Sequence, residues 1–514
     1  MSDVQADGGL TMGGSLLSGM KRAYPRMRDG AVCFSLAVLL LSSFIPLQLY
    51  APSISALLYA SAPIVGAAVV IFGFISRSIR LDLPGTIPLI VLQAVIVVST
   101  IVYRQYSLVD NIKAIIWMTI PTFLFFCPAK GEWGAGRLRH LFRITMPFCL
   151  IFGVLCSVSV GEYVLQYGEL ATSVTGETSY RAGFIDGRLF GVFTDPNYAA
   201  LAAILLIYVM VAALRARAFG RIISTAYLLS IVALAAYIVL SESRGAFACV
   251  IVTTVLGGFI LGYRLIRTRL AWPGWASFLS SFVVGGLCGA LAFGVIMGSR
   301  ALWPQLPRAL GTVHRVNGVE VEVLTNDAQW LAKQHGLDED GDGTIDVDLS
   351  SGRPDAGGTG DFTNNRMPIW RDAMEVWKAS PIVGATPRGY LDFAADRLGD
   401  LYIVKRRYLL HSAYISILVY GGILGAGAAL WWLLTCGFEV MRTIVRQLKK
   451  PDASYFATTM LLLASFAACF YGLALTSLFY SNTFSDYLFW LITGTAVSLT
   501  RELSGRHFRT EVFA

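Results

Sequence analysis

Long apolar runs, separated by short polar connections, dominate the chain. A run of about 20 apolar residues crosses a bilayer as a helix, at about 1.5 Å per residue. Twelve runs approach or reach that length, at residues 31–50, 54–76, 86–103, 111–127, 142–160, 197–214, 222–240, 245–263, 276–297, 413–435, 455–479 and 484–499. Their apolar residues are continuous rather than alternating, which favours helices over the strands of a membrane barrel. The pattern therefore predicts an all-α integral membrane protein with about twelve transmembrane helices.

One connection is much longer than the others. Residues 298–410, between the ninth and tenth runs, are mostly polar. We therefore expect an N-terminal tail (1–30), nine spans (31–297), a loop domain (298–410), three spans (411–500) and a C-terminal tail (501–514). The first run has no small-residue cleavage site after it, so we expect it to remain as a helix.

Charge predicts the orientation of these spans. The chain is 55% hydrophobic and 14% charged, with a net charge of +8. Lys and Arg gather in both tails and in alternate connections, whereas the opposite short connections hold only Arg104, Arg181, Arg188 and Arg244. By the positive-inside rule both termini are cytoplasmic and the long loop faces outward. This bias accounts for the net charge, so no nucleic-acid partner is expected.

All eight cysteines lie in or beside apolar runs. None lies in an outer loop, so neither an extracellular disulfide nor a cysteine metal site is expected.

Two patterns stand out in the first part of the long loop. Residues 313–324 alternate around Asn317-Gly318, which predicts a β-hairpin. An acidic run then has the spacing of a calcium loop. Its candidate ligands are Asp338, Asp340, Asp342 and Asp346. Leu349 stands where such loops usually carry a bidentate Glu, so a solvated acidic loop is the alternative. A bound calcium ion would be structural.

The last part of the loop predicts an amphipathic helix at residues 366–380. Ile369, Ala373, Val376 and Trp377 share one face, and Pro381 follows the end. A helix of this kind outside the membrane is suited to lying in the membrane interface.

His411 lies where the long loop meets the next span. An imidazole is suited to proton transfer near neutral pH, since its ordinary pKa is about 6.5. Gly422 and Gly425 follow about three turns into the predicted helix. An interfacial histidine followed by a glycine pair that packs helices is an equally good interpretation.

Arg188, Arg244 and Arg366 are expected on the same outer face. Each could be an ordinary surface arginine. Together they place three guanidinium groups, which match phosphate geometry, around one membrane surface. Arg244 falls in the first turn of a span, against the helix dipole, and this placement indicates an anionic partner. Arg181 and Lys113 are weaker candidates on that face.

Two absences narrow the class of protein. The connection at residues 47–53 has no carboxylate, whereas metal-dependent transferases of lipid-linked glycans usually need one there. The predicted spans carry almost no ionisable residues at mid-membrane, which weakens the interpretation as a transporter.

With these residues in view, residues 180–430 resemble the O-antigen ligase and polymerase superfamily, polytopic bacterial proteins that transfer glycans. The matching positions, in the family's order, are Arg188, Gly191, Phe193, Asp195, Pro196 and Asn197; Ser243, Arg244 and Gly245; Arg366, Trp370, Pro381 and Gly384; and His411, Ser412, Gly422 and Gly425. The calcium-like run departs from the family pattern, and the first spans carry no motif of the family.

The resemblance implies a transferase at the outer face of the bacterial cytoplasmic membrane. A glycan on undecaprenyl diphosphate would pass to an acceptor hydroxyl on a glycan, a lipid or a wall polymer. His411 would accept the proton, while Arg188, Arg244 and Arg366 would bind the diphosphate, without a nucleotide or a catalytic cofactor. Arg181, Trp370 and Lys113 would help to bind substrate. A polymerase of the same superfamily, a flippase for lipid-linked glycans and a non-catalytic receptor remain as alternatives.

Overall fold

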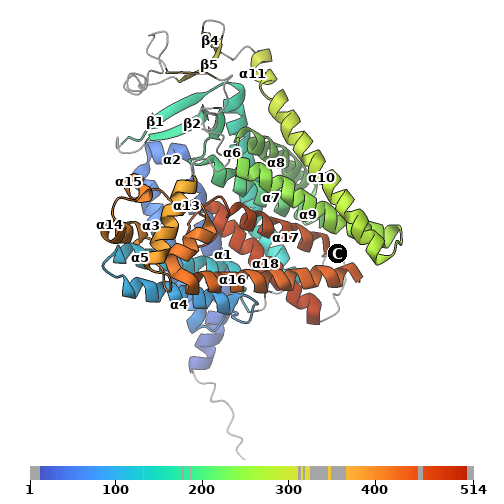
Figure 1. Cartoon of the computed structure of the whole chain (residues 1–514). Helices are drawn as coiled ribbons and strands as arrows, with labels where there is room; N and C mark the ends of the chain where they lie inside the picture. Colours follow the sequence, from blue (N-terminus) through green and yellow to red (C-terminus); the bar gives the residue numbers. More distant parts are fainter. Residues whose placement is uncertain are drawn as a thin grey trace, which may run out of the picture.

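A computed structural model describes most of the chain. The described residues are 12–130, 132, 134–174, 179–185, 187–310, 314–316, 319–324, 345–348, 366–449 and 455–505. They form a helical bundle with a small sheet, β1–β3, at one end (Figure 1).

Every predicted span coincides with helical structure. The helices concerned are α1 (Met12–Ser42), α2 (Ile45–Tyr50), α3 (Pro52–Ile75), α4 (Thr86–Val102), α5 (Leu108–Ile120), the π-helix η1 (Pro121–Phe126), α6 (Gly134–Val164), α7 (Pro196–Arg215), α8 (Arg221–Leu240), α9 (Arg244–Arg269), α10 (Gly274–Leu302), α16 (Ala413–Lys449), α17 (Tyr455–Tyr471) and α18 (Phe484–Gly505). Among the described residues, 8 helices are long and apolar enough to cross a membrane, and α4 and α17 are shorter apolar helices. The prediction of an all-α membrane protein is confirmed.

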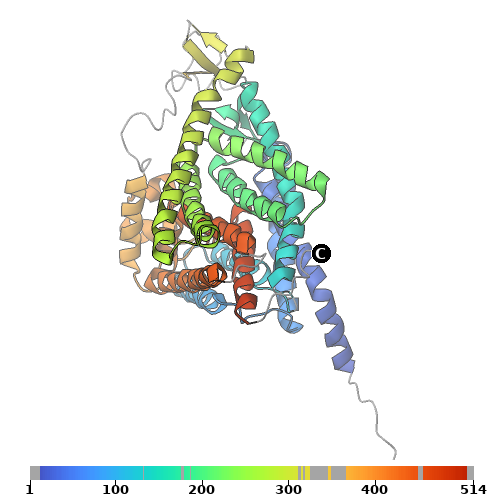
Figure 2. The ribbon, with the colours of Figure 1, turned by 90° about the vertical axis from the view of Figure 1, so that its right-hand side faces the viewer.

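Three predicted spans are not continuous, and one of them, at residues 413–435, is interrupted at Gly422. The run at residues 31–50 breaks after α1, and α2 then begins with Pro46 in its first turn. Figure 2 shows α1 projecting from the rest of the bundle. The run at 455–479 ends as a helix at Tyr471, and Leu478 and Tyr480 have positive φ angles. The buried Asp486 accepts a hydrogen bond from the Leu478 amide at 3.0 Å, so a polar group in α18 holds this irregular segment.

Sequence patterns did not reveal the sheet between α6 and α7. Strands β1 (Gly168–Thr172), β2 (Ser179–Ile185) and β3 (Arg188–Gly191) pair antiparallel in that order. Gly191 has φ +64°, and a Cβ there would lie 2.1 Å from Ser159 Oγ of α6. Glycine therefore lets β3 approach α6 closely, and β3 carries Arg188.

The front of the long loop contains a second sheet. Strands β4 (His314–Val316) and β5 (Val319–Leu324) pair antiparallel where the hairpin was predicted, and β6 (Ile345–Asp348) pairs with β5. Asp346 lies in β6 opposite Val323. The other calcium candidates (Asp338, Asp340 and Asp342) lie outside the described residues, so calcium binding stays a prediction.

Among its described residues, the rest of the loop forms four helices: α11 (Gln305–Leu310), α13 (Arg366–Ala379), α14 (Tyr390–Leu398) and α15 (Tyr402–Arg406). Helix α13 lies where the amphipathic helix was predicted. Its residues Ile369, Ala373 and Val376 are buried in the protein core. The apolar face therefore packs against protein, rather than lying in the membrane interface as we expected.

Helix α16 is interrupted at Gly422, which has φ 60° and ψ −159°. The segment that follows α13 fills the interruption. The Ile423 amide donates to the Pro381 carbonyl at 2.8 Å, and the Ala385 amide donates to the Val419 carbonyl at 2.7 Å. A Cβ at Gly422 would lie 2.3 Å from the Ile382 carbonyl, so only glycine fits. The long loop is thus anchored by its backbone to the helix that follows His411.

Candidate functional site

A cavity of about 590 Å³ brings together residues that are far apart in the sequence; we name it the larger cavity. Five of its lining side chains are candidates from the sequence: Arg188, Arg244, Arg366, Trp370 and His411. They come from β3, the start of α9, α13 and the residues just before α16. Four segments that are far apart in the sequence therefore meet at one concave surface.

Arg188 is held in place by hydrogen bonds. Its Nε donates to the Ser241 carbonyl and its Nη2 to Asn197 Oδ1, each at 3.0 Å. The guanidinium carbon also lies 5.6 Å from the centre of the Phe190 ring. A fixed guanidinium presents its charge at low entropic cost on binding.

Asn197 links Arg188 to a network that sequence analysis did not identify as part of the site. Its Oδ1 also accepts from Ser243 Oγ at 3.0 Å, and Ser243 Oγ lies 2.6 Å from Tyr471 Oη. Asn197 and Ser243 stand in the matching motifs, which was a usable signal. Nothing in the sequence singled out Tyr471, because its contact with Ser243 joins α17 to the start of α9.

Arg244 is the first residue of α9, and Ser243 caps that helix by accepting from the Ala246 amide at 3.4 Å. The Arg244 side chain is exposed, and within the described residues it has neither a hydrogen bond nor an ion pair with another side chain. A cation at a helix N-terminus is opposed by the helix dipole. An anion in the larger cavity would remove that conflict, and the helix N–H groups would attract it too.

Helix α13 carries Arg366 and Trp370 one turn apart, and both line the larger cavity. Trp370 Nε1 donates to the Leu410 carbonyl at 3.1 Å, next to His411. The helix that supplies an arginine therefore also holds the backbone of the histidine.

His411 is half-buried and has a left-handed backbone, with φ 49°. The amide of Ala413, two residues later, donates to the Gly472 carbonyl at 2.8 Å, so the residue that follows α17 helps to hold this bend. Burial lowers the pKa of His411 below 6.5, the nearby Arg366 lowers it further, and Asp195 opposes both. The imidazole is therefore neutral at neutral pH and can accept a proton.

Two sequence candidates do not line the larger cavity. Arg181, on β2, is exposed and lies 5.9 Å from the centre of the Phe190 ring. Lys113 is exposed on α5, where its Nζ pairs with Asp110 at 2.9 Å. The sequence placed Lys113 on the same predicted membrane face as the arginines, but Lys113 does not line the larger cavity.

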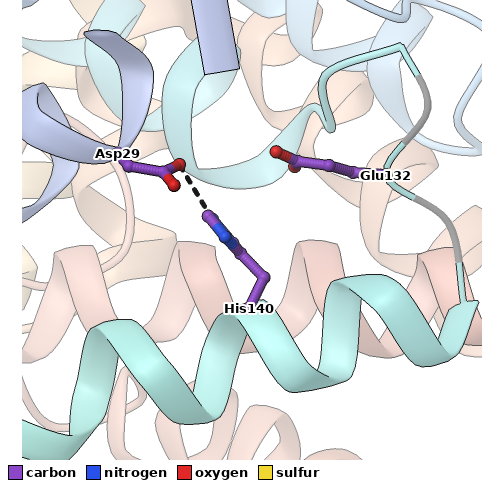
Figure 3. A group of neighbouring side chains, drawn as sticks. All are labelled: Asp29, Glu132 and His140. Carbon is purple, nitrogen blue, oxygen red and sulfur yellow. Dashed lines mark ion pairs between the residues drawn. The ribbon is translucent and has the colours of Figure 1, made fainter. Parts of the chain in front are cut away.

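A separate cluster has the residue types of a metal site: Asp29, Glu132 and His140, whose ligand atoms lie within 4.8 Å of one another (Figure 3). Glu132, however, pairs with Arg28 and Arg137, both fully buried. Burial opposes ionisation of Glu132, but the two guanidinium groups outweigh it and lower its pKa to about 2. A divalent cation would meet two fixed positive charges, so we interpret the cluster as an ion-pair network between α1, α6 and the connection before α6.

One part of the chain is similar to a known protein family. No curated protein sequence matches the chain. Residues 229–430 match a family model described as O-antigen ligase. The match spans Arg244, α13, His411 and the Gly422 interruption, whereas Arg188 lies before it. Residues 229–430 are therefore similar to the O-antigen ligase family.

Proposed function

We propose that the protein transfers a glycan from undecaprenyl diphosphate to an acceptor hydroxyl at the outer face of the bacterial cytoplasmic membrane. The observation that carries the proposal is the larger cavity, which Arg188, Arg244 and Arg366 line together with His411, whose pKa is lowered. Guanidinium groups match a diphosphate, and a neutral imidazole accepts a proton. The distribution of Lys and Arg supports cytoplasmic termini and an outward-facing cavity.

In this reaction the acceptor oxygen attacks the anomeric carbon of the donor glycan. A glycosidic bond forms, the bond from that carbon to the diphosphate oxygen breaks, and the hydroxyl proton passes to His411. The lipid diphosphate leaves with an added negative charge. Arginines stabilise the transition state when they lie where such charge develops.

Arg188 and Arg244 have different surroundings, so we expect them to have different roles. Arg188 is bonded to Ser241 and Asn197, so it suits the role of a fixed anchor. Arg244 is exposed at the start of α9 and can adjust to the leaving diphosphate. The proposal includes no nucleotide. It includes no catalytic metal either, because Asp195 is the one carboxylate among the described residues that line the larger cavity.

A polymerase would use the same donor and the same base and would differ only in its acceptor. A flippase needs cations along a deep path through the membrane. The arginines of the larger cavity instead come from a strand, the start of a helix and the long loop, so the cavity does not favour a flippase.

The test is replacement of His411 and Arg244 by Ala in cells, with Lys113→Ala as the matched control outside the larger cavity. We expect loss of surface glycan and accumulation of its lipid-linked precursor in the first two variants, at normal protein levels. The Lys113 variant should behave like the parent protein. Unchanged surface glycan in the His411→Ala variant would overturn the proposed mechanism.

A further inference from the structure

The larger cavity has two chemically different sides. Strand β3 and helix α9 contribute Arg188 and Arg244 to one side. The long loop and the residues before α16 form the other side, which carries Arg366, Trp370, Tyr402, Tyr408 and His411. In Figure 1, α13 and α15 lie to the left of α9. Diphosphate binding and proton transfer need the arginines and the histidine, and they leave Tyr402 and Tyr408 unused.

A tight backbone turn brings Tyr402 and Tyr408 together at the end of α15. Arg407, which follows the helix, has a left-handed backbone with φ 48°. The amide of Tyr408 then donates to the Ile403 carbonyl at 3.1 Å, so the chain folds back on the helix. The two tyrosine rings lie 5.4 Å apart between centroids, with 46° between their planes. We name these two residues the tyrosine pair.

The tyrosine pair is held firmly by its backbone, but its side chains are open. Ile403 is fully buried, and its amide donates to Asp372 Oδ2 of α13 at 3.1 Å. Tyr390 Oη donates to the Tyr408 carbonyl at 3.1 Å. Tyr402 and Tyr408 nevertheless remain 38% and 36% exposed. A ligand that contacts rings fixed in this way loses little entropy in ordering them.

Two open aromatic rings in a cavity indicate the chemistry of their ligand. A pyranose ring has apolar C–H groups on its faces and hydroxyl groups around its rim. A tyrosine side chain likewise combines an apolar ring with a polar hydroxyl tip. A lipid chain gains most from complete enclosure in an apolar groove, which open rings do not provide. The tyrosine pair therefore suits a sugar that stacks one face on the rings and keeps its hydroxyls in water.

We propose that the tyrosine pair binds a sugar ring of the acceptor, so that the acceptor is a saccharide. This inference rests on the proposed function. Leu409 and Leu410 are the two residues between Tyr408 and His411, the base that takes the proton of the acceptor. Both Tyr408 and His411 line the long-loop side of the larger cavity. The arginines of β3 and α9 hold the donor diphosphate on the other side.

The test measures transfer by the full-length protein in lipid nanodiscs. The donor is the lipid-linked precursor from cells that carry His411→Ala, and the acceptor is a membrane extract of cells that make no precursor. We expect Tyr402→Ala and Tyr408→Ala each to raise KM for the acceptor by at least about fivefold, because stacking is lost. The KM for the donor should stay unchanged. Tyr402→Phe, which keeps the ring, should restore the acceptor KM.

The matched control variant is Tyr50→Ala. Tyr50 is a tyrosine of α2 that is 74% exposed and does not line the larger cavity. Both KM values of this variant should equal those of the parent protein. Thermal unfolding of every variant shows that the fold is intact.

The chemical class of the acceptor is tested on the extract itself. Periodate cleaves sugar rings between neighbouring hydroxyl groups, so it should abolish the acceptor activity of the extract. Protease should leave that activity unchanged. An acceptor that is destroyed by protease and survives periodate would overturn the inference.

The kinetic outcomes separate this inference from the proposed function. If the alanine variants raise KM for the donor, lower kcat alone or change nothing, the tyrosine pair does not bind the acceptor and only this inference fails. If the parent protein transfers no glycan between the two fractions, the proposed function fails and the inference fails with it.

Discussion

Gly384 and Gly422 meet backbone to backbone. A Cβ on Gly384 would lie 2.5 Å from the Gly422 nitrogen, and a Cβ on Gly422 would lie 2.7 Å from the Gly384 nitrogen. Both residues have positive φ angles. Their contact joins the segment after α13 to the interrupted helix α16, and so it sets where Arg366 stands relative to His411.

Replacement of Gly422 by Ala should therefore destabilise the protein and abolish transfer. The added methyl group meets the Ile382 carbonyl in a backbone conformation that costs about 1–3 kcal/mol for residues other than glycine. Gly425→Ala should be tolerated, because its nearest contact would be an ordinary 3.5 Å to the Ile417 carbonyl. Thermal unfolding and glycan transfer of the two variants provide the measurement, and equal behaviour would contradict the role of the interruption.

The pH dependence of transfer should report the lowered pKa of His411. A base with a lowered pKa is protonated only at lower pH, so activity should fall with decreasing pH through a midpoint below 6.5. Arg366→Gln removes a charge that lowers this pKa, so the midpoint should move upward. The measurement is kcat/KM against pH for both proteins. A midpoint that does not move in the Arg366 variant would argue against electrostatic contact between the two residues.

Lysine should replace Arg244 better than Arg188. Arg188 bonds two acceptors at once with different nitrogens, which an ammonium group on a flexible stem cannot reproduce. We expect Arg188→Lys to lose about tenfold or more in kcat/KM, which corresponds to about 1.4 kcal/mol. Arg244→Lys, which keeps the charge at a side chain without such bonds, should lose less. The reverse order would show that Arg244 is the fixed anchor.

Glu132→Gln should lower stability without affecting the larger cavity. It leaves Arg28 and Arg137 buried without their counter-charge, at a cost of about 3–5 kcal/mol. Asp82→Asn is the matched control, since it removes a partly exposed ion pair with Arg80 that is worth about 0–1 kcal/mol. Thermal unfolding compares the two variants. A Glu132 variant as stable as the control would favour another role for the cluster in Figure 3.

Local patterns explain which parts of the structure were predictable. Apolar runs long enough to span a bilayer located the helices, and face periodicity located α13. Residue chemistry selected Arg188, Arg244, Arg366 and His411, which line one cavity. Lys113 shows the limit of this reasoning, because two residues predicted on one membrane face can still lie far apart on that face.

The remaining features depend on contacts between distant segments, which leave no period in a sequence. Strands β1–β3 are short and lack clean alternation, so their pairing was not visible. Gly384 and Gly422 join two segments through backbone atoms. Because every residue has the same backbone atoms, only the two glycines mark this contact in the sequence. Asn197 and Tyr471 acquire their role only through Ser243.

The irregular segment between α17 and α18 has a consequence for how this protein can diverge. Leu473, Ala474 and Leu475 border the larger cavity, while Asn482 and Thr483 border a second cavity of about 260 Å³. Asp486 holds the stretch between them. A substitution that reshapes this stretch changes both cavities together. Relatives with a different specificity should therefore carry substitutions in the lining of both cavities, rather than in the lining of one cavity alone.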